Sequence, residues 1–151
     1  MTALSIRPMT PEDVGETLAL RARTRENAID TEELAEVYGI TPESAAEALR
    51  SVQAGWVCET EGRIVGFAIG DRSNGEVVVV AVLPDFEGRG VGRTLLTRVE
   101  EMLHAAGHDS IWLWANPDPA VRASGFYHHL GWRDSGIVEH GDARLEKLLW
   151  R

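Results

Sequence analysis

An uninterrupted apolar run, Val77 to Leu83, leads directly into a glycine-rich turn and then into an amphipathic segment that continues to about Ala106. The run contains four consecutive valines, which favours a central strand covered on both faces. Glycines follow at the alternate positions Gly88, Gly90 and Gly92. A strand that turns into a helix in this way leaves backbone N–H groups free at the helix N-terminus, where the helix dipole favours negative charge. The segment therefore predicts a cradle for an anion such as phosphate.

Two known phosphate-binding loops can be tested against this turn by their spacing. A P-loop requires G-x-x-x-x-G-K-[ST], but Glu87 stands at the first glycine position and Arg93 at the lysine position. A dinucleotide-binding loop requires G-x-G-x-x-G, and its last glycine would also fall on Arg93. Both patterns fail, which leaves a G-x-G-x-G turn that opens a helix. Arg89 and Arg93 offer forked donors suited to phosphate oxygens, although both would equally fit solvent-facing positions.

Length and composition indicate one compact domain over residues 1–151, with 44% hydrophobic and 26% charged residues. The longest apolar run is far too short for a membrane span, and the N-terminus has no apolar core of signal-peptide length, so we expect a cytoplasmic protein. The net charge of −9 argues against a nucleic-acid partner, which requires clustered Lys and Arg. This charge suits a cationic or amine-bearing substrate, and it also favours solubility.

The chain has a single cysteine, Cys58, which excludes an internal disulfide and a cysteine-based zinc site. Its neighbours Trp56 and Val57 indicate that it packs in a strand instead of acting as a nucleophile. No metal is expected.

Capping residues, prolines and glycines predict the order of elements. Thr10 with Pro11, and Thr41 with Pro42, have the pattern of helix N-termini. Helices are expected at residues 10–23, 31–38, 41–55, 91–106 and 120–130. Strands are expected at 4–7, 56–60, 63–71, 77–83, 111–115, 132–140 and 144–150, with hairpins at Glu61-Gly62 and around Gly141-Asp142. This mixed order predicts an α/β or α+β fold around a mixed sheet.

A second motif follows the strand expected at 111–115. It reads Asn116, then Ala123-x-x-Phe126-Tyr127-x-x-x-Gly131-Trp132. With the turn from Val82 to Gly92 before it, the chain resembles the GCN5-related N-acetyltransferases, the GNAT family. The resemblance extends over essentially the whole chain and implies a mixed, mostly antiparallel central sheet of about seven strands flanked by helices. There are two departures from the family pattern: Glu87 stands where the family more often has Gln or Arg, and Trp132 replaces a Phe.

The resemblance implies transfer of an acetyl group from acetyl-CoA to a primary amine of a small molecule or protein, by direct attack in a ternary complex. Tyr127 takes the position of the general acid for the CoA thiolate; the alternative is a core tyrosine packed beside Phe126. Backbone N–H groups near Val82, where the family's strand bulges and splays, would stabilise the oxyanion. Asn116 would either bind pantetheine or cap the helix near Pro117. The residues implied to bind the cofactor are Val82, Leu83, Gly88, Arg89, Gly90, Val91, Gly92, Arg93 and Asn116.

Several questions stay open at the level of sequence. No general base is assigned. Glu76 lies just before the valine strand, at a position that could be too far from the reaction, and Glu26, Asp30, Glu139 and His140 are on segments that could border the acceptor pocket. A water chain, or a substrate that arrives as the free amine, is the alternative to a side-chain base. His128 and His129 are expected to point away from Tyr127 on the same helix. Glu87 could pair with Arg89 or Arg93. A non-catalytic acyl-CoA sensor of the same fold is the alternative function. Trp132 and Trp150 are expected in the core, and their exposure would instead indicate a homodimer interface.

Overall fold

The computed structural model describes residues 3–24, 31–117 and 122–149 of the chain. The strands are β1 (Ser5–Pro8), β2 (Gln53–Thr60), β3 (Arg63–Asp71), β4 (Glu76–Val82), β5 (Ser110–Ala115), β6 (Arg133–Glu139) and β7 (Asp142–Leu148). The helices are α1 (Val14–Arg21), α2 (Thr31–Tyr38), α3 (Pro42–Arg50), α4 (Val91–Ala105) and α5 (Arg122–His129), with 3-10 turns η1 (Pro11–Asp13) and η2 (Pro84–Phe86).

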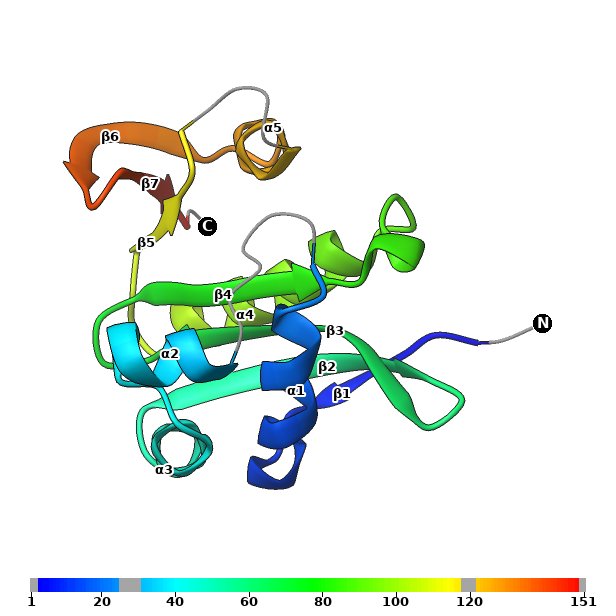
Figure 1. Ribbon diagram of the computed structural model, residues 1–151. Coiled ribbons are helices and arrows are strands. Elements are labelled where there is room, and N and C mark those ends of the chain that lie inside the picture. The colour runs from blue at the N-terminus through cyan, green and yellow to red at the C-terminus, as the bar shows by residue number, and fades with distance from the viewer. Residues whose placement is uncertain (1–2, 25–30, 118–121, 150–151) are drawn as a thin grey trace.

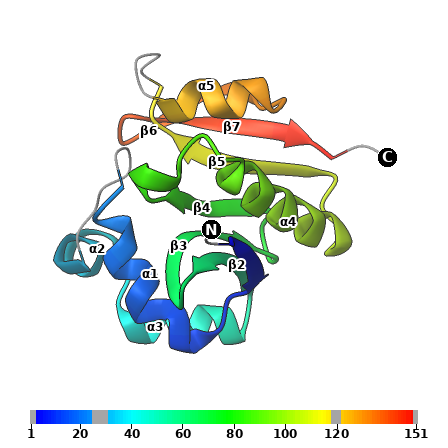
Figure 2. The same cartoon turned by 90° about the vertical axis from the view of Figure 1, so that its right-hand side faces the viewer.

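The strands form one seven-stranded sheet in the order β1-β2-β3-β4-β5-β7-β6. Among the described strands, β4 and β5 are the one parallel pair, and every other neighbour is antiparallel. Helices α1, α2 and α3 cover one side of the β2–β4 part of the sheet, and α4 lies on the opposite side (Figures 1 and 2). The expected mixed, mostly antiparallel α/β fold is therefore confirmed.

The two hairpin turns use residues with positive φ. Glu61 and Gly62 have φ of 52° and 77°, the conformation of a two-residue turn that matches the strand twist, so the predicted β2–β3 hairpin is confirmed. The β6–β7 turn consists of His140 and Gly141, with φ of 50° and 83°. It lies one residue earlier than predicted, because Asp142 already pairs with Glu139.

The helix predicted to continue to about Gly55 ends at Arg50 in α3. The Ser51 hydroxyl donates to the carbonyl of Glu47 at 3.0 Å, a local bond typical of a helix end. Strand β2 then begins at Gln53, because β3 offers a full-length partner whose ladder is extended by Arg72 N–H donating to the Val52 carbonyl at 2.8 Å. Tertiary pairing thus decides this boundary.

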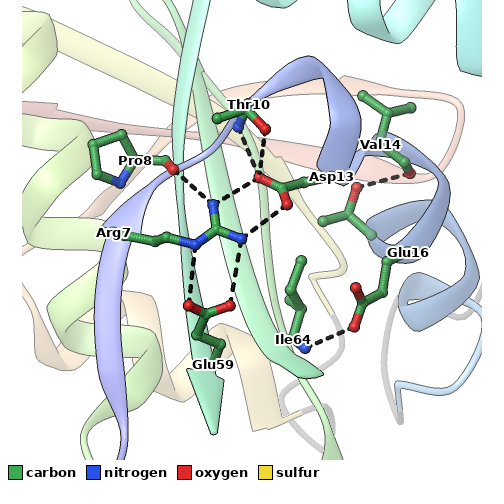
Figure 3. A network of polar contacts seen from close by, with 9 residues as sticks. Arg7, Pro8, Thr10, Asp13, Val14, Glu16, Glu59 and Ile64 are labelled. Atoms are coloured by element: carbon green, nitrogen blue, oxygen red, sulfur yellow. Dashed lines mark hydrogen bonds and ion pairs between the residues drawn. The ribbon is translucent and has the colours of Figure 1, made fainter. Parts of the chain in front are cut away.

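An arginine joins β1 to the start of α1 and to β2 (Figure 3). Arg7 donates to both carboxylate oxygens of Asp13 at 2.9 Å, and to those of Glu59 at 3.1 and 3.3 Å. Asp13 also accepts from the Thr10 N–H at 2.8 Å, closing the predicted capping pattern. Nearby, Glu16 of α1 accepts from the Ile64 N–H of β3 at 2.7 Å. These contacts hold the first helix against the sheet.

The core lies between α4 and the sheet. Val91, Leu95, Val99 and Leu103 form the buried stripe of α4. A Cβ at Gly70 of β3 would lie 2.6 Å from a Val99 methyl carbon, so the glycine permits this close approach. Further core residues are Cys58 and Trp132, exposed by 0% and 1%, as expected for packing roles. Trp150 lies outside the described residues. Among the helices described, none has the length and apolar character to cross a membrane.

Candidate active site

Strands β4 and β5 run parallel but are paired at a single point. The register joins Glu76 to Trp112, and the Trp112 N–H donates to the Gly75 carbonyl at 3.2 Å. No further rung joins these strands in the described part of the chain, and β5 turns away from β4 (Figure 1). The C-terminal half of β4 therefore borders an opening in the sheet, which we call the splay.

The register of β4 shows which of its N–H groups face the splay. In an antiparallel pair, successive residues direct their N–H groups alternately toward the partner strand and away from it. Leu83 N–H donates to the Val65 carbonyl of β3 at 2.9 Å. The N–H groups of Val82 and Val80 consequently point away from β3, toward the splay. Leu83, an expected cofactor contact, has its N–H committed to the sheet, and its carbonyl accepts from Phe86 N–H at 2.9 Å.

The bulge in β4 lies earlier than the resemblance implied. The β3–β4 register shifts between Ile69 and Gly70, which pair with Val79 and Val77, so Val78 is the extra residue. The expected position was near Val82. A run of four valines carries no signal for the position of a bulge, because each residue fits each site on the strand equally well.

After β4, the chain makes a compact turn into α4. Glu87 N–H donates to the Pro84 carbonyl at 3.2 Å, which closes η2. Gly88 and Gly90 then adopt φ of 77° and 80°, and neither has an atom within 4 Å of where its Cβ would lie. The first helical bond of α4 is Thr94 N–H to the Gly90 carbonyl at 3.0 Å. The N–H groups of Val91, Gly92 and Arg93 thus form the open N-terminus of α4.

The two arginines of the turn differ in their surroundings. The guanidinium carbon of Arg89 lies 5.1 Å from the centre of the Phe86 ring, and that of Arg63 lies 5.8 Å from the same ring. Arg93 is exposed on the first turn of α4. No acidic residue occurs in this first turn, so the helix dipole and Arg93 favour an anion at the N-terminus of α4.

Helix α5 meets β4 and α4 at the glycine turn. A Cβ on Gly92 would lie 3.5 Å from the Phe126 ring and 3.6 Å from a Val82 methyl carbon. Tyr127 is 8% exposed, with its ring 5.2 Å from that of Phe126 and 5.9 Å from that of Trp132 in edge-to-face geometry. The structure thus brings together the end of β4, the start of α4 and the Phe126-Tyr127 pair.

Asn116 follows β5 and is exposed. It lines a cavity of about 260 Å³ together with His128, Asp134 and residues of the β6–β7 hairpin. His128 Nε2 lies 3.4 Å from an Asp134 oxygen, and His129 is exposed, while their pointing away from Tyr127 stays a prediction. The segment 118–121 lies outside the described residues, and both proposed roles of Asn116 stay predictions.

Among the candidate bases, Glu76 lies far from the end of β4 that borders the splay. Glu76 begins β4, so it lies roughly 20 Å along the strand from Val82 at about 3.3 Å per residue. Its burial, followed by the charge of Asp71, raises the pKa of its carboxyl. Glu139 and His140 are exposed at the β6–β7 turn, and Glu26 and Asp30 lie outside the described residues. In the ranges that the structure describes, no cluster of three or more His, Cys, Asp or Glu side chains is arranged to hold a metal.

One residue beside the sheet was missed from the sequence. Arg21, in the last turn of α1, lines a cavity on the side of the sheet opposite α4. Its position does carry a signal, because it lies three residues after Leu18 and seven after Val14, on the buried stripe of the helix. A charged residue on such a stripe is unusual and indicates a specific role.

Comparison with known proteins agrees with this geometry. A family model described as acetyltransferase (GNAT) domain matches residues 52–134, more than half of the chain. PaiA N-acetyltransferase of Thermoplasma acidophilum, in complex with coenzyme A, superposes with a TM-score of 0.80 at 16% identity, covering 97% of this chain and 99% of that one. The Escherichia coli ribosomal-protein-S18-alanine N-acetyltransferase gives 0.74 at 18% identity, covering 99% and 96%.

Salmonella typhimurium YncA, in a structure with its cofactor acetyl-CoA, has a TM-score of 0.71 at 18% identity, covering 99% of this chain and 95% of that one. These likenesses show a shared fold over nearly the full length. Together with the family match, they establish that the chain belongs to the acetyltransferase (GNAT) family of acyl-transferring enzymes.

Proposed function

We propose that the protein is an acetyl-CoA-dependent N-acetyltransferase that acetylates a primary amine by direct attack in a ternary complex. The observation that carries the proposal is the splay. It presents the Val82 N–H beside an opening in the sheet, and the same strand leads within a few residues into an unblocked helix N-terminus. Acetyl-CoA carries a thioester and a pyrophosphate joined by the extended pantetheine arm. The thioester would match the splay, and the pyrophosphate would match the helix N-terminus.

The residues of the turn fit a pyrophosphate. Val91, Gly92 and Arg93 would direct their N–H groups to the phosphate oxygens, while Gly88 and Gly90 leave the approach open. Arg89 and Arg93 would add charge-assisted bonds. The departure at Glu87 is compatible with a pyrophosphate site. Its backbone N–H already donates to the Pro84 carbonyl in η2, so the backbone contacts to phosphate would begin at Gly88.

The proposed acetyl transfer needs two hydrogen-bond donors from the chain, one to the carbonyl oxygen and one to the departing sulfur. The amine nitrogen forms a bond to the acetyl carbon while the carbon–sulfur bond breaks; the nitrogen loses one proton and the sulfur gains one, so the products are the amide and the CoA thiol. Val82 N–H, directed into the splay, would donate to the carbonyl oxygen as it gains negative charge. The hydroxyl of Tyr127 would donate to the departing sulfur. The acceptor is an amine of a small molecule or a protein, and the functional unit is one domain over residues 1–151.

The test measures release of the CoA thiol from acetyl-CoA across a panel of amines, for the parent protein and for Tyr127→Phe. We expect turnover in the parent and a loss of roughly 10²-fold in kcat for the variant, as is typical for removal of a general acid. CoA affinity should be unchanged, because the phenylalanine ring preserves the contacts with Phe126 and Trp132.

Two outcomes would contradict the proposal. Tight CoA binding without turnover on any amine would indicate the non-catalytic sensor instead. Full activity in Tyr127→Phe would remove Tyr127 from the mechanism and leave it as a core residue. Circular dichroism of the variant provides the control for folding.

A further inference from the structure

A cavity of about 210 Å³ lies between α1, α3 and the sheet. Its walls are mostly apolar side chains contributed by both helices and by strands β3 and β4, and its polar members are Thr17, Arg21, Ser44 and Gln53. The principal apolar ones are Val14, Leu18, Leu49, Phe67, Ile69 and Val78. A volume of this size is below that of a typical whole-ligand pocket, and it suits one apolar group of the size of a side chain.

The one cation lining this cavity is Arg21. Its Nε is buried and has no hydrogen-bond partner in the described part of the chain, and the guanidinium forms none of the ion pairs found there. Arg7 on the same side of the sheet shows the contrast, because two carboxylates satisfy its guanidinium. Burial lowers the pKa of Arg21, and the nearby Tyr38 opposes this shift only in part.

Arg21 is half-buried, and the desolvation of its Nε, which is buried without a partner, is not offset, so this position costs the fold stability. The apolar stripe of α1 would accept a methionine or leucine at this position without that penalty. The arrangement is therefore explained if the partner of Arg21 is a ligand. A guanidinium is matched best by a carboxylate or a phosphate, to which it can donate two parallel bonds.

The cavity adjoins the splay along β4. Val78 and Val79 form part of its wall, and the next residue, Val80, directs its N–H into the splay. Helix α1 crosses in front of β3 and β4 and ends at Arg21 near β4 (Figure 1). A ligand seated in this cavity would thus extend toward the edge at which the acetyl group is placed in the proposed function.

We propose that the acceptor is a small amino acid-like molecule whose carboxylate binds Arg21 and whose apolar group fills the cavity between α1, α3 and β4. This inference rests on the proposed N-acetyltransferase function and gives its substrate class. A carboxylate is preferred to a phosphate because a 210 Å³ site with apolar walls offers Arg21 as its only cation, too little charge for a dianion.

The net charge of −9 does not oppose this assignment. Its influence at long range is screened within about 8–10 Å at physiological salt. The acidic side chains of α2 and α3 are exposed, so water weakens their field at the half-buried guanidinium. They are Glu32, Glu33, Glu36, Glu43 and Glu47.

The first experiment measures binding without any acetyl transfer. Its ligands are 4-methylpentanoate, which is leucine without its amine, and the neutral 4-methylpentanamide, titrated calorimetrically into the full chain. We expect the acid to bind at least 10-fold more tightly than the amide, and Arg21→Met to remove this difference. Arg50→Met, an exposed arginine on α3, is the matched control and should retain it. Equal binding of acid and amide, or an unchanged preference in Arg21→Met, would overturn the proposal.

The second experiment compares leucine with leucinamide in the thiol-release assay. We expect KM for leucine to rise at least 10-fold in Arg21→Met with little change for leucinamide, and the thermal midpoint of the variant to be unchanged or higher. If no amine is acetylated but the acid still binds through Arg21, the site stands and the acetyltransfer proposal fails. If leucinamide and leucine are acetylated equally well by the parent protein, acetyl transfer stands and the carboxylate site fails.

Discussion

At the scale of single residues, the glycine turn owes its shape to two left-handed positions. Gly90 has φ of 80° and open space around it, so an added methyl group meets no atom but forces a disfavoured backbone conformation. We expect Gly90→Ala to destabilise the protein by about 1 kcal/mol and to weaken CoA binding by more than 10-fold. Urea unfolding and calorimetric titration of CoA measure the two effects.

Gly107, just after α4, provides the control for backbone strain. It also has positive φ, 103°, with nothing within 4 Å of its Cβ position. It lies beyond the far end of α4, roughly 25 Å from Gly90 at about 1.5 Å per residue. Gly107→Ala should lower stability without changing CoA affinity. Equal CoA affinity in both alanine variants would separate the glycine turn from cofactor binding.

The role of a residue can be predicted from the sequence when it depends only on the local backbone conformation. Glycines at alternate positions before an amphipathic segment predict a left-handed turn, and the structure has it at Gly88 and Gly90. Arg21 carries a signal in its place on the buried stripe of α1, but its proposed role depends on which side chains surround it and on whether any of them pairs with it, and none of the described residues does. Both conditions arise from distant segments that pack on α1.

At the scale of elements, the regular segments were predictable and their ends less so. Helix α2 and strand β3 have the predicted bounds, because Gly39 and the Glu61-Gly62 turn mark their limits in the sequence. The end of α3 and the start of β2 could not be predicted, since pairing of β2 with β3 decides both positions. The bulge at Val78 is equally a property of the pairing, and no side chain marks it.

The Arg7–Asp13–Glu59 contacts make one link between elements dependent on pH. The hydrogen bonds from Arg7 are the main reason why the pKa of Asp13 falls from 3.8 to about 2. Because the folded pKa is lower, the ionised carboxylate stabilises the fold above pH 4, and this contribution disappears as the pH falls toward 2. We expect it to amount to about 1–2 kcal/mol, as Arg7 is partly exposed. Urea unfolding between pH 2 and 6 measures it.

Asp13→Asn should make the free energy of unfolding nearly independent of pH between pH 4 and pH 2. The amide still accepts a hydrogen bond, but it is not protonated in this range. Glu12→Gln changes the exposed neighbouring carboxylate and serves as the control, which should retain the parent's slope. A parent curve that stays level from pH 4 to pH 2 would show that Asp13 is not stabilised by Arg7 in solution.

At the scale of the whole molecule, the sheet consists of two antiparallel parts, β1–β4 and β5–β7–β6, joined by the single rung at Glu76 and Trp112. Packing of α4 on β3 and of α5 at the glycine turn adds to this connection. Side chains add further links: Lys147 Nζ of β7 donates to the Glu100 carboxylate of α4 at 3.1 Å, and Trp112 Nε1 donates to the Asn74 carbonyl at 3.0 Å. The order of elements predicted the sheet, but the extent of the opening depends on how these helices pack. In the proposed function, CoA occupies this opening and contacts both parts.

Ligand binding across the opening should therefore stabilise the molecule as a unit. A ligand at 100 times its Kd adds about 2.7 kcal/mol to the free energy of unfolding, which for a chain of this size raises Tm by roughly 5–10 °C. We expect this shift with CoA in calorimetry, in a single transition, and a smaller one for Gly90→Ala at the same CoA concentration. A gain confined to one of two separate transitions would mean that CoA contacts one part of the sheet alone. An equal gain in Gly90→Ala would place its binding site away from the glycine turn.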